Sequence, residues 1–91
     1  EYRQQIRLEA TPVKPLIEMI VNQLSSSWKR KKLTVTLEEP SESVAIKTNA
    51  DWLKQVFVNL IDNSVKYTPE GGKILIKHWI EDNMAYFMVK D

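Results

Sequence analysis

Residues 55–69 constrain the fold of this chain more than any other segment. Apolar residues recur there at helical spacing, which predicts an amphipathic helix that must lie against a core. Asn49 or Asp51 can cap its start, and the proline- and glycine-containing run 69–72 is expected to end it. The expected apolar positions are Trp52, Leu53, Val56, Phe57, Leu60, Ile61 and Val65. The rest of the chain must supply the surface that covers this face.

A second amphipathic pattern precedes the first. Thr11 is expected to cap this earlier helix, with Pro12 at its first position. Its apolar face is expected to run from Val13 to Trp28. The basic residues 29–32 would close it, where cations complement the helix dipole.

Alternating apolar and polar residues predict strands elsewhere. The expected strands are 5–10, 33–37, 44–46, 73–80 and 84–89, the last two forming a hairpin around Asp82 and Asn83. This order of elements predicts an α+β fold in which helices pack on one face of a mixed, mostly antiparallel sheet.

The composition excludes several classes of function. Thirteen basic and 12 acidic residues leave a net charge of +1, which gives no electrostatic case for a nucleic-acid partner. The chain has no cysteine, and His78 is its one histidine, so disulfide scaffolds and multi-histidine metal sites are excluded. No apolar run is long enough for a membrane span, so a cytoplasmic setting is expected.

The helix predicted from residues 55–69 carries a polar stripe. Gln55, Asn59 and Asn63 are spaced i, i+4, i+8, and Lys66 and Tyr67 extend the stripe by about one turn. Apolar neighbours suggest that the stripe borders a core instead of facing open solvent. The amides could simply bond one another or nearby backbone. Alternatively, amide oxygens suit magnesium, lysine suits phosphate, and a tyrosine ring can pack on a purine.

This run resembles the N box of sensor histidine kinases, a signature of the GHKL superfamily. Ser64 stands where alanine is usual in the family. The matching residues are Gln55, Val56, Asn59, Leu60, Asn63, Lys66, Tyr67, Thr68, Pro69, Gly71 and Gly72. The resemblance implies an incomplete two-layer α/β sandwich of the Bergerat type. Residues 1–91 would be the N-terminal part of the ATP-binding domain, ending where an Asp-x-Gly-x-Gly motif begins.

The resemblance also implies roles for five residues. Asn63 would be the magnesium ligand, with the metal bridging the nucleotide phosphates, and Asn59 would support the phosphate end. Lys66 would contact phosphate, and Tyr67 would pack near the adenine. Asp91 would accept a hydrogen bond from the adenine amino group. The implied cofactors are ATP and Mg²⁺.

By the same resemblance, the parent protein would transfer the ATP γ-phosphate to a protein histidine. ATP-hydrolysing superfamily members carry a glutamate one turn before the magnesium asparagine, whereas this chain has Asn59, which cannot act as a general base at neutral pH. The implied partners are a phosphoacceptor histidine domain of the same protein and a response regulator. The domain would be cytoplasmic, in a parent anchored in the bacterial membrane. His78 would be an ordinary strand residue, and the 91 residues alone would be inactive.

Two alternatives remain at this stage. One is another GHKL member, such as an anti-sigma serine kinase, and the other is a non-enzymatic interaction module that binds no nucleotide. An uncovered sheet edge is expected to promote self-association. Trp28, Trp52 and Trp79 are expected to pack in the core and not to form a ligand cage.

Overall fold

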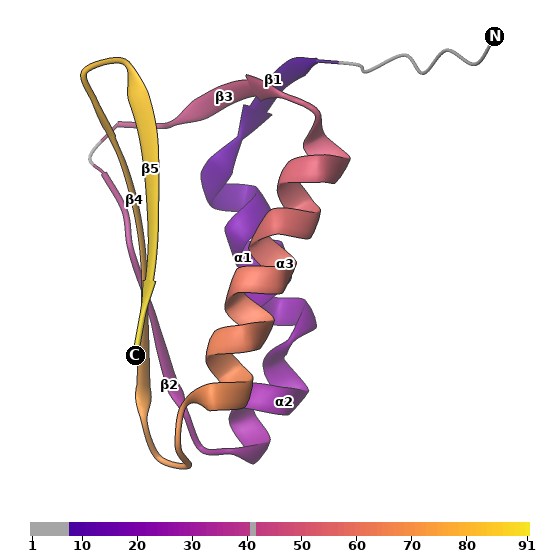
Figure 1. Cartoon of the computed structure of the whole chain (residues 1–91), viewed down its shortest axis with the longest axis vertical. Helices are drawn as coiled ribbons and strands as arrows, with labels where there is room; N and C mark the ends of the chain where they lie inside the picture. Colours follow the sequence, from indigo (N-terminus) through magenta and orange to yellow (C-terminus); the bar gives the residue numbers. More distant parts are fainter. Residues whose placement is uncertain (1–7, 41) are drawn as a thin grey trace, which may run out of the picture.

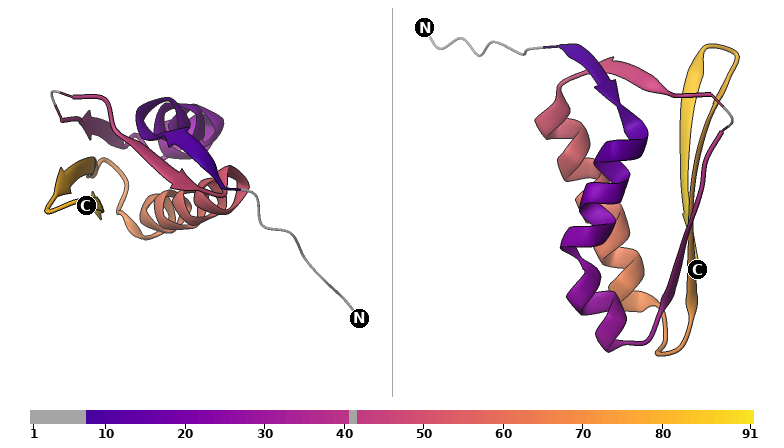
Figure 2. Two further views of the ribbon diagram at one scale, coloured as in Figure 1. Left: turned by 90° about the horizontal axis from the view of Figure 1, so that it is seen from above. Right: turned by 180° about the vertical axis from the view of Figure 1, so that it is seen from behind.

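The computed structural model describes residues 8–40 and 42–91, and Figure 1 shows two layers. One layer is a three-stranded sheet in the order β2 (Thr34–Glu38), β4 (Lys73–Glu81), β5 (Met84–Lys90). Helices α1 (Val13–Gln23) and α3 (Ala50–Tyr67) lie side by side over one face of it, as both views of Figure 2 show. The sheet is mixed, because β2 and β4 are parallel while β4 and β5 are antiparallel. The predicted α+β class is confirmed.

A separate two-stranded ladder lies at one end of the helical layer (Figure 1). It pairs β1 (Glu9–Pro12) with β3 (Ala45–Thr48) in antiparallel register. In the part of the chain that the structure describes, this ladder does not join the three-stranded sheet.

The core lies between the helices and the inner face of the sheet. Phe57 of α3 meets Phe87 of β5 edge to face, with ring centroids 4.9 Å apart. The buried apolar residues are Val13, Ile17, Ile20, Val21, Leu33, Val44, Leu53, Phe57, Ile61, Val65, Ile74 and Ile76. On α1 and α3 these residues recur at helical spacing, so one continuous stripe of each of these two helices is buried.

Local signals set the ends of α3 and the hairpin turn. The Asn49 side chain accepts a hydrogen bond from the Trp52 backbone N–H at 2.8 Å, so the predicted cap is confirmed. Helix α3 ends at Tyr67, because Thr68 precedes Pro69 and is held in an extended conformation. The hairpin turns at Asp82 and Asn83, which have φ of 52° and 62°. These are left-handed conformations that short polar residues tolerate.

The predicted start of the first helix is wrong. Thr11 and Pro12 belong to β1, where they pair with Ile46 and Ala45, and α1 begins at Val13. Proline's fixed φ fits an extended strand end as well as a first helical turn, so pairing with β3 decides between the two. The expected strand 5–10 begins at Glu9, and its first residues lie outside the described part of the chain.

The first helix is also not continuous to Trp28. Helix α1 ends at Gln23, and a short helix α2 (Ser25–Arg30) follows after Leu24. A run of serines begins α2, and serine side chains compete for backbone hydrogen bonds, which favours the start of a helix over its interior.

Two of the expected core tryptophans lie elsewhere. Trp28 packs against the core, and its indole N–H donates to the Val21 carbonyl at 2.9 Å. Trp52 is 61% exposed on the outer side of α3, as is Leu60 at 46%. Trp79 stacks on Tyr86 on the opposite side of β4 from the buried Ile74 and Ile76. Spacing alone could not tell an apolar residue at the border of the buried stripe from one inside it.

Candidate functional site

Helix α3 presents its amide stripe on the side opposite the core. Gln55, Asn59 and Asn63 are all exposed. The expectation that this stripe borders a core is therefore wrong for the described residues, none of which buries it. The purely structural alternative is met in part, because Gln55 and Asn59 bond one another, but this pair is exposed and the Asn63 side chain does not join it within residues 8–40 and 42–91.

The amides of the stripe are only partly engaged. The side-chain N–H of Gln55 donates to the Asn59 carbonyl oxygen at 3.1 Å. Within residues 8–40 and 42–91, the Asn63 side chain makes no hydrogen bond, so its amide oxygen is available to a ligand. Along the axis of the helix, Asn59 and Asn63 are about 6 Å apart, which is the rise of four helical residues.

Lys66 and Tyr67 extend the stripe at the C-terminal end of α3. The Lys66 ammonium lies 3.2 Å from Asp62 Oδ2, one turn back, and both side chains are at least a third exposed. An exposed pair of this kind contributes under about 1 kcal/mol, so Lys66 can turn to an incoming anion. Tyr67 is 80% exposed, and its ring is free to stack.

The structure brings Asp91 to the same end of α3. Thr68 Oγ1 lies 2.6 Å from the Ser64 carbonyl oxygen and 3.3 Å from Asp91 Oδ2. Thr68 is 2% exposed, so this hydroxyl is a buried link between the end of α3 and the residue after β5. Asp91 therefore lies next to the turn that follows Lys66 and Tyr67, although it is distant in sequence.

The two glycines of the motif shape this turn. A Cβ at Gly72 would lie 2.6 Å from Thr68 Cγ2 and 2.9 Å from the Pro69 carbonyl oxygen, so a side chain would clash there. Gly71 has φ +81°, a conformation that favours glycine. The two glycines therefore let the chain turn back with its backbone close to the Thr68 side chain.

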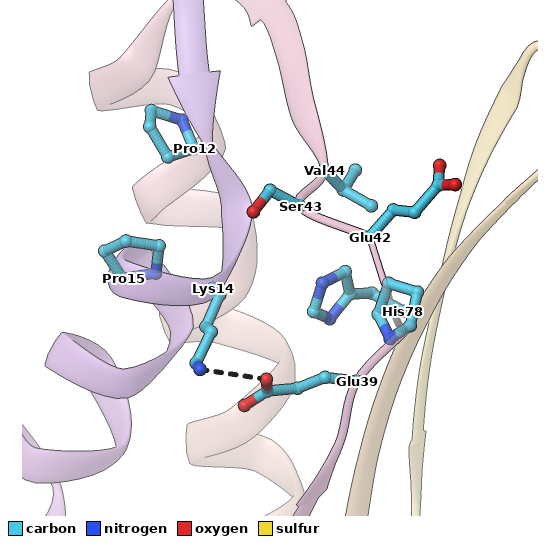
Figure 3. A pocket seen from close by; sticks show the side chains of 9 residues that line it. Pro12, Lys14, Pro15, Glu39, Glu42, Ser43, Val44 and His78 are labelled. Atoms are coloured by element: carbon cyan, nitrogen blue, oxygen red, sulfur yellow. Dashed lines mark ion pairs between the residues drawn. The ribbon is translucent and has the colours of Figure 1, made fainter.

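A pocket of about 270 Å³ lies apart from the stripe, near the start of α1 (Figure 3). Within it, Lys14 Nζ lies 3.1 Å from Glu39 Oε2, and this pairing raises the pKa of Lys14. His78 is 4% exposed, and its burial lowers the pKa of the imidazole. The pocket is lined by Pro12, Lys14, Pro15, Glu39, Pro40, Glu42, Ser43, Val44 and His78. None of the five predicted site residues lines it.

Sequence reasoning missed three residues that shape the stripe. Asp62 pairs with Lys66, which its i, i+4 spacing could have indicated. Thr68 was matched to the motif but given no role, and Lys31 bonds the end of α3 from a distant segment. No local signal separates Lys31 from the basic residues beside it.

The described residues define a two-layer α+β domain whose second long helix has an exposed amide, lysine and tyrosine stripe. No helix in ranges 8–40 and 42–91 is long and apolar enough to cross a membrane. Over the same ranges, no cluster of three or more histidine, cysteine or acidic residues is arranged to hold a metal.

Sequence comparison relates the chain to sensor kinases. It is 39% identical over 62 residues to the adaptive-response sensory kinase SasA of Synechococcus elongatus, covering 68% of this chain and 16% of SasA. It is 31% identical over 88 residues to the sensor histidine kinase SpaK of Bacillus subtilis, covering 94% of this chain and 19% of SpaK. The chain thus spans less than a fifth of the length of these relatives. No protein-family model matches it.

Structural comparison gives the same class. The catalytic domain of histidine kinase ThkA matches with a TM-score of 0.87 at 20% identity, over 92% of this chain and 57% of that one. Full-length ShkA in complex with AMPPNP matches with a TM-score of 0.83 at 21% identity, over 97% of this chain and 19% of that one. The chain is a relative of sensor histidine kinases, and its fold is that of part of their catalytic domain.

Proposed function

We propose that this chain is the ATP-binding portion of a two-component sensor histidine kinase, which transfers the ATP γ-phosphate to a protein histidine. The observation that carries the proposal is the outer face of α3, where Asn63 is exposed and its side chain makes no hydrogen bond among the described residues. The names of SasA and SpaK and the AMPPNP bound by ShkA support it.

The chemistry of the stripe fits a magnesium nucleotide. Magnesium takes oxygen ligands, keeps several waters, and is commonly held by few protein groups together with phosphates. Asn63 would supply the protein oxygen, and Asn59, one turn earlier, would support the phosphate end. Lys66 would leave Asp62 to contact phosphate. A bound magnesium would neutralise charge on the phosphate oxygens.

The base would lie at the C-terminal end of α3. Tyr67 would pack near the adenine, and the Asp91 carboxylate would accept a hydrogen bond from its amino group. Thr68 supports this role, because its hydroxyl lies 3.3 Å from Asp91 Oδ2 and ties that carboxylate to the helix end. The two ends of the nucleotide would thus be held by one helix and the residue after β5.

The reaction would be transfer to a histidine and not hydrolysis. Asn59 has no basic group with which to activate a water molecule. His78 is buried in β4 beside the Lys14–Glu39 pair, so an acceptor histidine would come from a separate phosphoacceptor domain of the parent protein. The 91 residues alone would then be inactive.

The wider setting follows from the same proposal. A response regulator would receive the phosphoryl group downstream, and ThkA has been solved in complex with the response regulator protein TrrA. We propose a cytoplasmic position for this domain, within a parent anchored in the bacterial membrane. The names of the relatives do not favour a serine kinase or a non-enzymatic module.

Titration calorimetry with Mg²⁺ and AMPPNP tests the proposal. The chain should bind the analogue only with magnesium, and Asn63→Ala should weaken binding at least about tenfold, as expected for loss of a charge-assisted contact. Asn22→Ala removes another exposed asparagine, from α1, and should leave the affinity unchanged. Equal loss in both variants, or no magnesium-dependent binding, would contradict the proposal.

A further inference from the structure

Lys31 differs from the basic residues around it. Lys29, Arg30 and Lys32 are exposed, whereas Lys31 is half-buried. Its Nζ donates to the backbone carbonyl oxygens of Val65 at 2.8 Å and Lys66 at 3.0 Å. A basic run that the sequence indicates to be a solvated helix end therefore contains one lysine directed at a distant helix.

The two acceptors are carbonyls that a helix cannot satisfy by itself. The last four C=O groups of an α-helix have no partner within it, and they form the negative end of the helix dipole. A lysine ammonium that bonds two of them supplies both the missing donors and a complementary charge. Lys31 thus caps α3 from outside that helix.

The backbone of Lys31 holds the following turn as well. Its carbonyl oxygen accepts a hydrogen bond from the Gly71 N–H at 2.9 Å. Thr34, at the start of β2, donates to the Gly72 carbonyl at 3.0 Å. Figure 1 shows α2 beside the end of α3, where these contacts form. One residue therefore fixes both the last turn of α3 and the glycine turn after it.

We propose that Lys31 is a positioning residue for the nucleotide. It fixes the backbone from which Lys66 and Tyr67 project, so that the phosphate contact and the adenine platform are preformed before ATP arrives. Its own ammonium is occupied by the two carbonyls and acts through those residues. The inference rests on the proposed function of the outer face of α3, and it adds a residue from another segment to that site.

Amide hydrogen exchange of the chain without nucleotide tests the first half of the inference. Lys31→Met keeps the length of the side chain and removes its donors. The amides of residues 66–68 should then exchange about tenfold faster, because two charge-assisted bonds to their turn are lost. Arg30→Met removes an exposed charge from the same segment and should leave the exchange of the amides of residues 66–68 unchanged. Lys31→Arg retains a cationic donor and should restore most of the protection.

Affinity for Mg²⁺ and AMPPNP tests the second half. Lys31→Met should bind the analogue about three- to tenfold more weakly, because ordering the last turn must then accompany binding. Arg30→Met should bind like the unmodified chain. If Lys31→Met speeds exchange of the amides of residues 66–68 but binds the analogue with unchanged affinity, the positioning role is overturned. If Lys31→Met leaves that exchange unchanged, the cap itself is overturned.

The outcomes separate this inference from the proposed function. If the unmodified chain binds no nucleotide, the proposed function fails and the positioning role fails with it, while the exchange rates still decide whether Lys31 caps α3. Protection of amides 53–61 reports whether the core remains folded. Should Lys31→Met lose that protection, Lys31→Gln, which removes the ammonium and shortens the side chain but keeps it polar, takes its place in both measurements.

Discussion

The two faces of α3 differ in what determines their residues. The inner face has Leu53, Phe57, Ile61 and Val65, each buried in the core. The outer face has Gln55, Asn59 and Asn63 at the same spacing of four, all exposed. Packing within the chain explains the inner face. It does not explain the outer face, because asparagine is a poor helix former and Asn63 gains no side-chain hydrogen bond within residues 8–40 and 42–91.

This contrast separates the residues that maintain the fold from those available to a ligand. Changes to the inner face should lower stability. Changes to the outer face should leave stability nearly unaltered and act on binding. The two faces meet at the C-terminal end of α3, where Thr68 is buried although Tyr67 beside it is exposed.

The largest effect on stability is expected at the centre of the inner face. Phe57→Ala removes a buried ring that contacts Phe87, and it should lower the free energy of unfolding by about 3–5 kcal/mol. Urea unfolding followed by circular dichroism measures it. A loss below about 1 kcal/mol would mean that this face does not determine the fold.

A smaller effect is expected where the two faces meet. Gly72→Ala places a Cβ against Thr68 and the Pro69 carbonyl, and it should cost about 1–3 kcal/mol through overpacking. The same unfolding assay applies. Because Thr68 also contacts Asp91, this variant should weaken nucleotide binding too. Unchanged stability would show that the turn does not depend on the close approach of Gly72 to Thr68 and Pro69.

Acid should destabilise the chain partly through His78. Its pKa is lowered in the folded state by burial, while the nearby Glu39 partly opposes that shift. The unfolded chain therefore binds the proton more readily, so the contribution is complete above the unfolded pKa of about 6.5 and is lost as the pH falls toward the folded pKa. Unfolding free energies between pH 7.5 and pH 5 should fall more for the unmodified chain than for His78→Gln. If the unfolding free energies of the two proteins fall in parallel with pH, His78 is not a source of the acid destabilisation.

The smallest stability effect is expected on the outer face. Asn63→Ala should change the free energy of unfolding by no more than about 0.5 kcal/mol, and the sign should be stabilising, because alanine is the better helix former. Thermal unfolding of the two proteins measures this change. A destabilisation above about 1 kcal/mol would show that Asn63 serves the fold and that the faces are not separate.

The sequence predicted features that depend on local chemistry. The Asn49 cap, the end of α3 before Pro69 and the Asp82 turn each rest on residues a few positions apart. Thr11 and Pro12 were misplaced because their partner strand β3 lies more than thirty residues away. The Trp52 and Leu60 exposures depend on which elements cover α3, and spacing does not contain that information.

The candidate site likewise has a part that local sequence predicts and a part that depends on distant segments. The stripe from Asn59 to Tyr67 was visible because it follows one helix, although its exposure was not. Thr68 reaches Asp91 across 23 positions and Lys31 reaches Val65 across 34, so only the folded chain brings these pairs together. The roles of Asn59, Asn63, Lys66, Tyr67 and Asp91 toward a nucleotide stay predictions.

The separation of the two faces is tested most directly by the side-chain amide NMR signals of the ¹⁵N-labelled chain during titration with Mg²⁺ and AMPPNP. Binding at the outer face of α3 should shift the signals of Asn59 and Asn63, together with the backbone signals of Lys66, Tyr67 and Asp91. The side-chain amide of Asn22 on α1 should not move. Shifts gathered instead around His78 and Glu39, or none in any of these signals, would contradict a nucleotide site on the outer face.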